Sequence, residues 1–348
     1  MKPDDKQSAP VKQHVGTDAV LVGQAKQVIH WCKPGDNTLF ANVSGAIGAS
    51  IFSFVYLIAP MWILTTLITT AVAPFWHGTL YMWIPLVLSA ILPVTPSIYL
   101  LQSWPLKYLP VYFDFTEIME STDEEVAHLM RTRRAVFAAQ PHGVFTMGGA
   151  CSGITWCKRF WSPHTCPTAV ANAVIQTPFI RHVVGLFGLS DASSKTLKRT
   201  LKSKSVVLYP GGIAELFLTD HKEERLYAKK RKGFVKVALD SGADIIPCYI
   251  FGNTQVLKIA KGKWLRKFAR ATGVSITWFW GIAGSPIPLK RKIVMVVGKP
   301  MNIPQISNPT QEDIDKYHAV YVSEVQRIFD TYKHTNPDFV DKVLQFEE

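Results

Sequence analysis

Residues 135–144 have the sequence AVFAAQPHGV, in which a short apolar run ends in a histidine held between a proline and a glycine. Three similar runs follow at Ser205–Tyr209, Asp244–Phe251 and Ile293–Val297, and charged stretches of helical character separate them. Short apolar runs that end at Gly or Pro are typical of buried strands, and their alternation with helices is typical of α/β domains. We therefore expect a mixed sheet flanked by helices over residues 107–348. Its polar residues should gather at the carboxyl ends of the strands.

The region before this domain contains no Asp, Glu, Lys or Arg from Asn37 through Leu106. One apolar run extends from Asn42 to Trp76 and a second continues to about Trp104. Each run is long enough to cross a bilayer, which takes roughly 20 residues of helix. Its internal prolines favour kinks or a re-entrant path. We therefore expect residues 37–106 to form a membrane hairpin of two transmembrane or re-entrant helices, and an uncharged stretch of this length disfavours the alternative of a soluble core.

The basic residues of the chain lie outside that uncharged stretch. The 348 residues include 38 Lys and Arg against 26 Asp and Glu, a formal net charge of +12. A basic domain joined to an uncharged segment favours anionic partners, such as phospholipid head groups or a phosphorylated cofactor. No recognisable nucleic-acid module accompanies the charge, so we expect no nucleic-acid partner. Residues 1–36 are polar, so we expect a polar N-terminal tail without a cleavable signal peptide.

The histidine of the first quoted segment is the leading candidate for catalysis. His142 follows a predicted strand, Pro141 fixes the backbone before it, and Gly143 leaves room for a substrate. Acyl transfer from a thioester to an alcohol needs a general base, which typically contributes about a hundred- to ten-thousand-fold in rate. The thioester is already activated, so no covalent enzyme intermediate is required. The alternative is a structural histidine at the end of a strand.

Two further segments carry residues that could bind a substrate. In the loop Tyr209–Glu215, the adjacent Gly211 and Gly212 let main-chain N–H groups approach a carbonyl oxygen or a phosphate, and Glu215 could bind an acceptor hydroxyl or orient His142. A Pro-Gly-Gly sequence alone is more often a simple turn. The second segment starts a predicted helix with two cations, and it contributes Arg231, Lys232, Gly233 and Phe234. Cations at a helix N-terminus oppose the helix dipole, so this start favours a bound anion.

Other features of the sequence have weaker functional interpretations. The cations Lys195, Lys198, Arg199 and Lys202 share a helical face that suits either coenzyme A phosphates, anionic lipids or plain solvation. Residues 258–270 combine cations with Trp264 and are typical of a segment in the membrane interface. A helix that begins at a Thr310 cap should serve packing.

The cysteines do not indicate a zinc site or a nucleophile. Cys32, Cys151, Cys157, Cys166 and Cys248 lack paired C-x2-C spacing, and we expect reduced thiols that face the cytosol. The set Cys157, His164 and Cys166 lacks a fourth ligand, so we predict no metal. Residues 149–153 resemble a nucleophile elbow around Cys151, but such an elbow needs a strand directly before it.

In this order and at this spacing, the three segments are similar to the type-2 acyl-CoA:diacylglycerol acyltransferase family. The family's His-Pro-His-Gly corresponds to Gln140–Gly143, its Pro-Gly-Gly-x-x-Glu to Pro210–Glu215 and its Arg-Lys-Gly-Phe-Val-Lys to Arg231–Lys236. Weaker likenesses extend the match over about 39–332. The resemblance implies a glycerolipid-acyltransferase-like fold over residues 107–348, facing the cytosol. It also implies an enzyme of the endoplasmic reticulum membrane that esterifies diacylglycerol with acyl-CoA, without a cofactor.

By this resemblance His142 is the catalytic base, and Gln140, Pro141, Gly143 and Glu215 support it. The first histidine of the signature is Gln140 here, and the usual acidic residue after Phe-Gly is Asn253. Acyltransferases that accept glycerol phosphate resemble this layout but carry His-x4-Asp and an arginine in the second loop. This chain has neither, since Thr146 and Met147 are the fourth and fifth residues after His142, so an uncharged acceptor is favoured. Monoacylglycerol and fatty alcohol stay open as acceptors. A non-catalytic lipid-binding protein is the alternative of another class, and the resemblance also allows a lipid-droplet location and a homo-oligomer.

Overall fold

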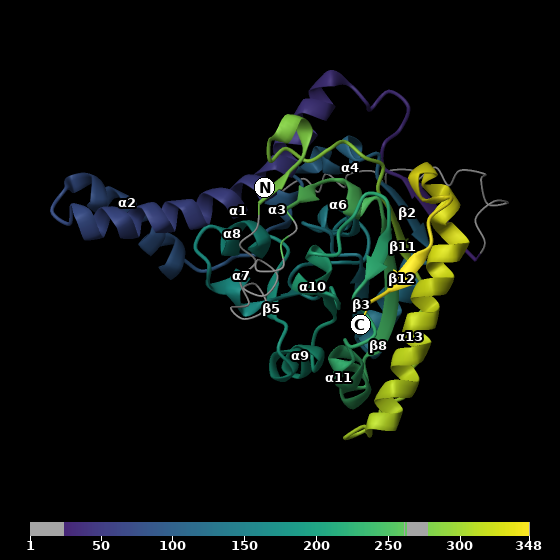
Figure 1. Ribbon diagram of the computed structural model, residues 1–348. Coiled ribbons are helices and arrows are strands. Elements are labelled where there is room, and N and C mark those ends of the chain that lie inside the picture. Colours follow the sequence, from purple (N-terminus) through teal and green to yellow (C-terminus); the bar gives the residue numbers. More distant parts are fainter. Residues whose placement is uncertain (1–23, 261, 263–277, 348) are drawn as a thin grey trace, which may run out of the picture.

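The protein is described by a computed structural model over residues 24–260, 262 and 278–347, and its centre is an eight-stranded mixed sheet (Figure 1). The strands lie in the order β1 (Gln27–His30), β2 (Thr116–Met119), β11 (Val294–Val297), β8 (Asp244–Phe251), β3 (Ala135–Gln140), β6 (Val206–Leu208), β4 (Thr168–Val170) and β5 (Leu189–Asp191). Strands β8, β3, β6, β4 and β5 run parallel to one another, whereas β11 is antiparallel to β8. The predicted α/β class and the four strands quoted from the sequence are confirmed.

Helices cover both faces of the sheet. They are α1 (Leu39–Val72), α2 (His77–Ile91), α3 (Ile98–Leu101), α4 (Leu109–Tyr112), α5 (Asp123–Thr132), α6 (Met147–Trp156), α7 (Asn172–Gln176), α8 (Ile180–Gly185), α9 (Ser194–Leu201), α10 (Ile213–Leu216), α11 (Gly233–Ser241) and α13 (Gln311–Tyr332). Single 3-10 turns are η2 (Leu106–Tyr108), η3 (Asn253–Gln255), η4 (Ile282–Gly284), η5 (Lys333–Thr335) and η6 (Pro337–Phe339). Two small sheets pair β9 (Lys258–Ile259) with β10 (Phe279–Trp280), and β7 (Glu224–Leu226) with β12 (Leu344–Phe346).

The central strands divide the hydrophobic core into two layers. In β3, Phe137 and Ala139 face one buried cluster while Val136 and Ala138 face the other. This alternation is the two-residue period of a strand, and both layers are buried because helices lie on each face. The first layer includes residues of α1, α4 and α6, and the second includes residues of α9, α11 and α13.

Helix α13 begins where the sequence predicts. The Thr310 side chain accepts a hydrogen bond from the Asp313 main chain, and the Asp313 carboxylate accepts one from the Thr310 main chain, which forms a capping box. Its buried face includes Ile314, Tyr321 and Ile328. The predicted packing role is confirmed.

Helix α1 packs against the sheet domain along its first half and projects from it along its second half (Figure 1). A β-carbon on Gly45 would lie 2.6 Å from the Tyr108 carbonyl oxygen, and one on Gly48 would lie 3.1 Å from that of Pro105. Only glycine permits this close approach to the chain before and within α4. Among the described residues, α1 is the one helix that is long and apolar enough to cross a membrane.

The second arm of the predicted hairpin is shorter than the sequence suggests. Helix α2 has 15 residues, about 22 Å at 1.5 Å per residue, and it packs back on α1 through a hydrogen bond of 3.1 Å from Trp62 Nε1 to the Met82 carbonyl oxygen. It ends before Pro93 and Pro96, which disfavour continued helix in the residues before them. The apolar run to Trp104 is therefore not one helix.

The chain leaves the sheet for this hairpin and returns to the neighbouring strand. Strand β1 precedes α1, β2 follows the hairpin, and the two pair antiparallel from Gln27 opposite Met119 to His30 opposite Thr116. The end of the predicted polar tail over residues 1–36 is therefore an edge strand. A four-residue strand has too short a pattern to be distinguished from a tail.

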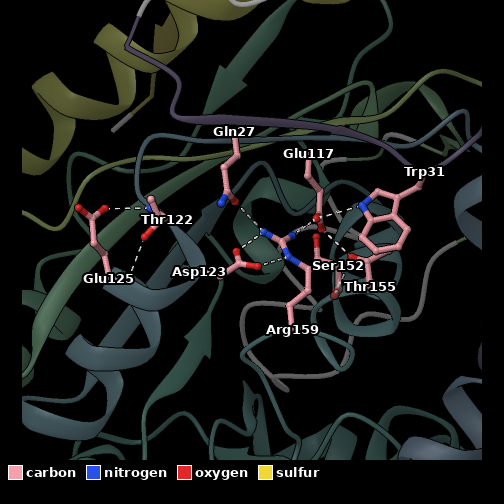
Figure 2. Close-up of polar contacts among 9 residues, drawn as sticks. All are labelled: Gln27, Trp31, Glu117, Thr122, Asp123, Glu125, Ser152, Thr155 and Arg159. Atoms are coloured by element: carbon pink, nitrogen blue, oxygen red, sulfur yellow. Dashed lines mark hydrogen bonds and ion pairs between the residues drawn. The ribbon is translucent and has the colours of Figure 1, made fainter. Parts of the chain in front are cut away.

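A buried ion-pair network fixes this edge of the sheet (Figure 2). The Glu117 carboxylate of β2 pairs with Arg159 at 2.6 Å, and it accepts hydrogen bonds from Thr155 Oγ1 at 2.6 Å and Trp31 Nε1 at 3.0 Å. Arg159 also pairs with Asp123 at the start of α5. The network joins the segment after β1 to the last turn of α6.

Candidate active site

Three loops meet at one edge of the sheet. Strands β6, β3 and β8 are parallel neighbours, so the segments that follow their carboxyl ends emerge side by side. These segments carry Glu215, His142 and Asn253 respectively. Carboxyl ends of parallel strands are the usual ligand-binding edge of such sheets. The sequence-predicted loops around His142 and Glu215 are therefore brought together.

Glu215 holds the His142 loop by its main chain. One carboxylate oxygen accepts a hydrogen bond from Gln140 Nε2 at 2.5 Å, and the other accepts one from the His142 main-chain N–H at 2.9 Å. Glu215 was predicted to bind an acceptor hydroxyl or to orient His142, and the contact that the structure shows is with the His142 main chain. Only 2% of Glu215 is exposed, and both of these hydrogen-bond donors are uncharged.

The environment of Glu215 shifts its ionisation toward neutral pH. Burial raises the pKa of the Glu215 carboxyl to about 7, because the charged form loses solvation. Main-chain hydrogen bonds from His142 and Tyr227, the Gln140 amide and the charge of Arg231 limit this increase in pKa. The carboxylate is therefore poised to change charge in the physiological range.

Gln140 links this carboxylate to the C-terminal helix. Its amide oxygen accepts a hydrogen bond from the Tyr321 hydroxyl of α13 at 2.9 Å. The Phe234 ring packs edge-on against Tyr321, with ring centroids 5.0 Å apart. Phe234 is buried against Tyr321, and its predicted contact with substrate stays a prediction. The sequence gives Tyr321 only as a packing residue of a helix, so no local signal reveals its link to Gln140.

Asn253 closes the other side of the same loop. Its Nδ2 donates to the Pro141 and His142 carbonyl oxygens at 3.1 and 2.7 Å, and its Oδ1 accepts from the Gly148 main-chain N–H at 3.1 Å. The side chain is buried, so these bonds have no competition from water. Asn253 therefore spans the loop from Pro141 to the start of α6, a role that the sequence does not indicate.

The glycine after the histidine has a different role from the one predicted. Gly143 adopts φ of +63°, and a β-carbon there would lie 2.8 Å from the Asn253 carbonyl oxygen. The space beside Gly143 is thus filled by Asn253 and is not free for a substrate. Glycine is required here for its conformation and for this close contact.

The His142 ring is half-buried beside Tyr209. Its Nδ1 lies 3.0 Å from the Gly143 carbonyl oxygen, and the two rings meet edge-on with centroids 5.4 Å apart. Burial lowers the pKa of His142 below its ordinary value, and the Gly143 carbonyl opposes this effect. The imidazole is therefore neutral near pH 7.

The adjacent glycines of the second loop shape the seat of Glu215. A β-carbon on Gly211 would overlap the Glu215 carboxyl group, and Gly212 adopts φ of +50°. Gly211 is buried, and the space beside its Cα is filled by the Glu215 carboxyl group and not by a ligand. Substrate contact by Gly211 and Gly212 stays a prediction.

The cationic helix start finds partners within the protein. Lys232 Nζ pairs with the Asp315 carboxylate at 2.8 Å, and the Arg231 guanidinium lies 5.1 Å from the Tyr227 ring centroid. These contacts within the protein offset the unfavourable interaction of the two cations with the dipole of α11, so no external anion is needed for that purpose. Arg231 and Gly233 are nevertheless exposed at the same sheet edge as Glu215, so anion binding stays a prediction.

The rival sites from the sequence have different outcomes. Cys151 lies inside α6, fully buried, and burial raises the pKa of its thiol well above the usual range, so the nucleophile-elbow hypothesis is wrong. Within the described parts of the chain, no group of three or more His, Cys, Asp or Glu side chains could hold a metal ion. Lys198 pairs with Asp240 at 2.5 Å, which leaves Lys195, Arg199 and Lys202 exposed around α9. Most of the predicted interface segment 258–270 lies outside the described residues.

Comparison with known proteins gives consistent matches. A sequence model of the family described as Diacylglycerol acyltransferase matches residues 99–346. The human protein Diacylglycerol O-acyltransferase 2-like protein 6 is 31% identical over 260 residues, covering 67% of this chain and 74% of that protein. Diacylglycerol O-acyltransferase 2 of Dictyostelium discoideum is 30% identical over 252 residues, with the same two coverages of 67% and 74%. The crystal structure of the 1-acyl-sn-glycerophosphate (LPA) acyltransferase PlsC from Thermotoga maritima aligns with a TM-score of 0.38 and 14% identity, over 78% of this chain and 97% of that one.

Proposed function

The chain belongs to the diacylglycerol acyltransferase family, and we propose that it moves a fatty acyl group from acyl-CoA to the free hydroxyl of diacylglycerol with His142 as general base. Acyl transfer and the formation of triacylglycerol follow from the family. This membership removes the alternative of a non-catalytic lipid-binding protein. The assignment of roles to individual residues rests on the geometry of the sheet edge.

The tautomer of His142 supports its role as the base. A carbonyl oxygen only accepts hydrogen bonds, so the contact of 3.0 Å with Gly143 places the proton on Nδ1. The other nitrogen, Nε2, then carries the free lone pair. A neutral imidazole with a free Nε2 is the form that can accept a proton from an alcohol.

The reaction needs no covalent enzyme intermediate. The acceptor hydroxyl oxygen attacks the thioester carbonyl carbon while its proton passes to His142 Nε2, which gives a tetrahedral intermediate. The carbon–sulfur bond then breaks, and the imidazolium returns its proton to the departing coenzyme A thiolate. The products are triacylglycerol and free coenzyme A, and the histidine ends in its starting state.

The remaining residues of the site act by positioning. Glu215 and Asn253 fix the main chain on either side of His142, and Gln140 fixes the Glu215 carboxylate. The exposed Arg231, with Lys232 beside it, suits the phosphates of coenzyme A, because a cation at this edge faces the loop that holds the reacting thioester. No cofactor enters this scheme, since acyl-CoA is a substrate.

A membrane location supports the same reaction, because acceptor and product both dissolve in lipid. We propose the endoplasmic reticulum membrane, with lipid droplets as a second location. The pairing of β1 with β2 requires both ends of the hairpin to return to one side, and basic flanks such as Lys33 and Lys107 favour the cytosol. A multi-pass path then requires α1 to cross and the shorter α2 to return, and a homo-oligomer is compatible with it.

Replacing the base provides the test. His142→Ala should lower kcat for acyl-CoA-dependent triacylglycerol synthesis in microsomes about a hundred- to ten-thousand-fold at equal protein level. His164→Ala is the matched control, because His164 is exposed in a loop away from this edge, and it should keep wild-type activity. Equal activity of His142→Ala and wild type would remove the base assignment.

An acceptor panel tests the substrate. The same membranes receive diacylglycerol, monoacylglycerol, fatty alcohol or glycerol phosphate with labelled acyl-CoA. We expect diacylglycerol to give the highest kcat/KM, with monoacylglycerol and fatty alcohol as the nearest competitors. A preference for glycerol phosphate would contradict the neutral acceptor.

A further inference from the structure

The His142 ring is held by fewer contacts than its main chain. Glu215 and Asn253 hold the backbone on either side of the ring. Within the described residues, the ring makes one hydrogen bond, between Nδ1 and the Gly143 carbonyl oxygen at 3.0 Å. A single neutral hydrogen bond changes an equilibrium by only about five-fold, and a side chain otherwise occupies several rotamers. A base that must face a bound alcohol therefore needs a second restraint on its ring.

Tyr209 packs against the imidazole. It follows β6, the parallel neighbour of the strand that leads to His142. The two rings meet edge-on, with centroids 5.4 Å apart and an angle of 83° between their planes. Edge-on contact is a favoured geometry of aromatic pairs. Tyr209 also packs against the buried cluster that includes residues of α6. This contact limits the orientations that are open to the imidazole.

The Tyr209 hydroxyl is anchored at the start of α6. A side-chain hydrogen bond joins it to Thr146, the N-cap residue of that helix. Thr146 Oγ1 in turn accepts a hydrogen bond from the Gly149 main-chain N–H at 3.2 Å. Burial raises the pKa of Tyr209 to about 12 and the hydrogen bond with Thr146 opposes this increase, so the hydroxyl is neutral at physiological pH. The Tyr209 side chain is therefore fixed at both ends, by β6 and by α6.

The anchor requires a glycine at position 149. A β-carbon on Gly149 would lie 1.9 Å from the Tyr209 hydroxyl oxygen and 2.5 Å from Thr146 Oγ1. A larger residue therefore needs displacement of the tyrosine or of the threonine. The position of Tyr209 thus explains the first glycine of the segment that resembles a nucleophile elbow.

We propose that Tyr209 is a positioning residue, which holds the His142 imidazole in the orientation that presents Nε2 to the acceptor hydroxyl. Its ring lies against the imidazole, and its hydroxyl ties that ring to the first turn of α6. The loop that carries the base and the helix that follows it then keep one geometry around the imidazole. The inference rests on the proposed function, because the base assignment of His142 comes from it.

Two substitutions separate the ring of Tyr209 from its hydroxyl. Tyr209→Leu removes both, and kcat of the monodisperse, detergent-purified full chain should fall roughly ten-fold. Tyr209→Phe keeps the ring and loses the anchor, and kcat should fall about two- to five-fold. KM for acyl-CoA and for diacylglycerol should keep the wild-type values, because the base acts in the transition state. A rise in either KM with wild-type kcat would contradict the proposal.

The control for these variants is Tyr99→Leu. It makes the same substitution at a tyrosine that is 90% exposed, and it should keep the wild-type kcat. An equal loss of kcat in Tyr99→Leu and Tyr209→Leu would show that the effect does not depend on contact with His142.

The contact with Gly149 gives a test that simple loss of folding does not reproduce. Gly149→Ala should push the hydroxyl away and lower kcat about ten-fold. In the double variant with Tyr209→Phe, the added methyl group takes the space that the hydroxyl leaves. Its kcat should rise to within about two-fold of Tyr209→Phe alone, because residues in contact do not act independently. A double variant in which the two losses simply multiply would contradict the anchor.

Chemical modification reports on the ring without catalysis. Diethyl pyrocarbonate acylates neutral imidazole nitrogens, and mass spectrometry of the peptides gives a rate for each histidine of the full chain. An imidazole that is no longer held turns toward solvent, so Tyr209→Leu should speed modification of His142 about three- to ten-fold. His164 is exposed and lies in a loop away from this edge, so its rate is the internal reference. An unchanged His142 rate in Tyr209→Leu would overturn the proposal.

The two proposals fail in different ways. Full activity of His142→Ala contradicts the proposed base, and the modification rates still decide whether Tyr209 holds the ring. An inactive His142→Ala together with wild-type kcat and modification rate in Tyr209→Leu keeps the proposed function and removes the positioning role.

Discussion

Two buried carboxylates hold the segments on either side of helix α6, and their partners differ. Glu215 fixes the loop that leads into α6 and receives hydrogen bonds from the neutral Gln140 amide and the His142 main chain. Glu117 fixes the last turn of α6 and is paired with Arg159 at 2.6 Å, with 2% or less of either side chain exposed (Figure 2). The same acid therefore occurs once with a contacting cation and once without.

This difference separates a structural carboxylate from a functional one. Burial raises the pKa of both carboxyls, and at Glu117 the charge of Arg159 and the hydrogen bonds from Thr155 and Trp31 oppose this increase. Loss of either partner of the Glu117–Arg159 pair would leave the other buried without its partner, so the main effect of this pair is on folding. Glu215 has neutral hydrogen-bond donors and no cation in contact, and burial raises its pKa to about 7, while the charge of Arg231 limits the increase. Changes at Glu117 and Arg159 should alter stability, and changes around Glu215 should alter activity.

The largest expected effect is on folding and comes from Arg159→Met. The variant leaves Glu117 buried without its cation, and the free energy of unfolding should fall by about 3–5 kcal/mol. Thermal or denaturant unfolding in lipid nanodiscs measures this change. Lys26→Met removes a cation of the exposed pair with Glu125, where 44% of the lysine side chain is accessible, and should cost at most about 1 kcal/mol. Similar losses for the two variants would contradict the structural role of the Glu117 network.

An intermediate effect, on activity, is expected from Glu215→Gln. Wild-type activity should fall as the pH decreases through about 7, because a protonated Glu215 no longer offers two acceptor oxygens to Gln140 and His142. Protonation of His142 does not cause this decrease in activity, since burial lowers the pKa of His142. The glutamine side chain cannot be protonated in this range, so the pH–activity profile of Glu215→Gln should no longer show the activity limb, which is the decrease below about pH 7. Its kcat should fall on the order of ten- to hundred-fold, because the base His142 is misplaced.

The stability of the wild type gives an independent check on Glu215. Its folded-state pKa lies above the unfolded value, so the folded state binds more protons between about pH 4.5 and 7. The contribution of this group to stability therefore decreases as the pH rises through that window, and Glu215→Gln should remove this part of the slope. Glu124→Gln, at an exposed position of α5, should keep both the wild-type slope and the activity limb. Retention of the limb in Glu215→Gln would assign it to another group.

The smallest expected effect comes from Asn253→Asp, which introduces the acid that the family usually carries after Phe-Gly. An aspartate cannot donate to the Pro141 and His142 carbonyl oxygens, and a buried acceptor without its donor costs about 1–3 kcal/mol. We expect kcat to fall roughly ten-fold, the equivalent of about 1.4 kcal/mol, with KM for acyl-CoA unchanged. Asn302→Asp, at an exposed site, is the control. Wild-type kcat in Asn253→Asp would show that the loop does not depend on this amide.

Much of the fold can be predicted from the sequence, because strands and helix caps are specified by residues that are adjacent in the chain. Strand β8 has the predicted bounds, and β3 extends to Gln140, one residue beyond the apolar run Ala135–Ala139 from which the strand is predicted. Each is an apolar run that ends at a turn residue. The capping box at Thr310 is likewise a pattern of adjacent residues. The shorter α2 is explained by Pro93, which the sequence contains but which leaves the choice between a kink and an end open.

The supporting contacts of the site could not be predicted, because they join distant parts of the chain. Tyr321 and Gln140 are 181 residues apart, and Asn253 and His142 are 111 apart. Strand order brings such pairs together, and a single sequence does not specify strand order. The same reason explains why the sequence left open whether Glu215 binds an acceptor hydroxyl or orients His142, and could not predict its contact with the His142 main chain.

The two glycines of α1 that rest on the chain around α4 have a mechanical consequence. At these glycines the backbone of α1 lies against the Tyr108 and Pro105 carbonyl groups and the side chains of Tyr112 and Leu109, and Phe52 adds a ring contact with Phe187, so the first half of α1 is packed against the sheet domain. Bilayers differ in thickness, and a long apolar helix answers a mismatch by changing its tilt. If α1 crosses a membrane as proposed, we expect a change in its tilt to turn the packed sheet domain with it.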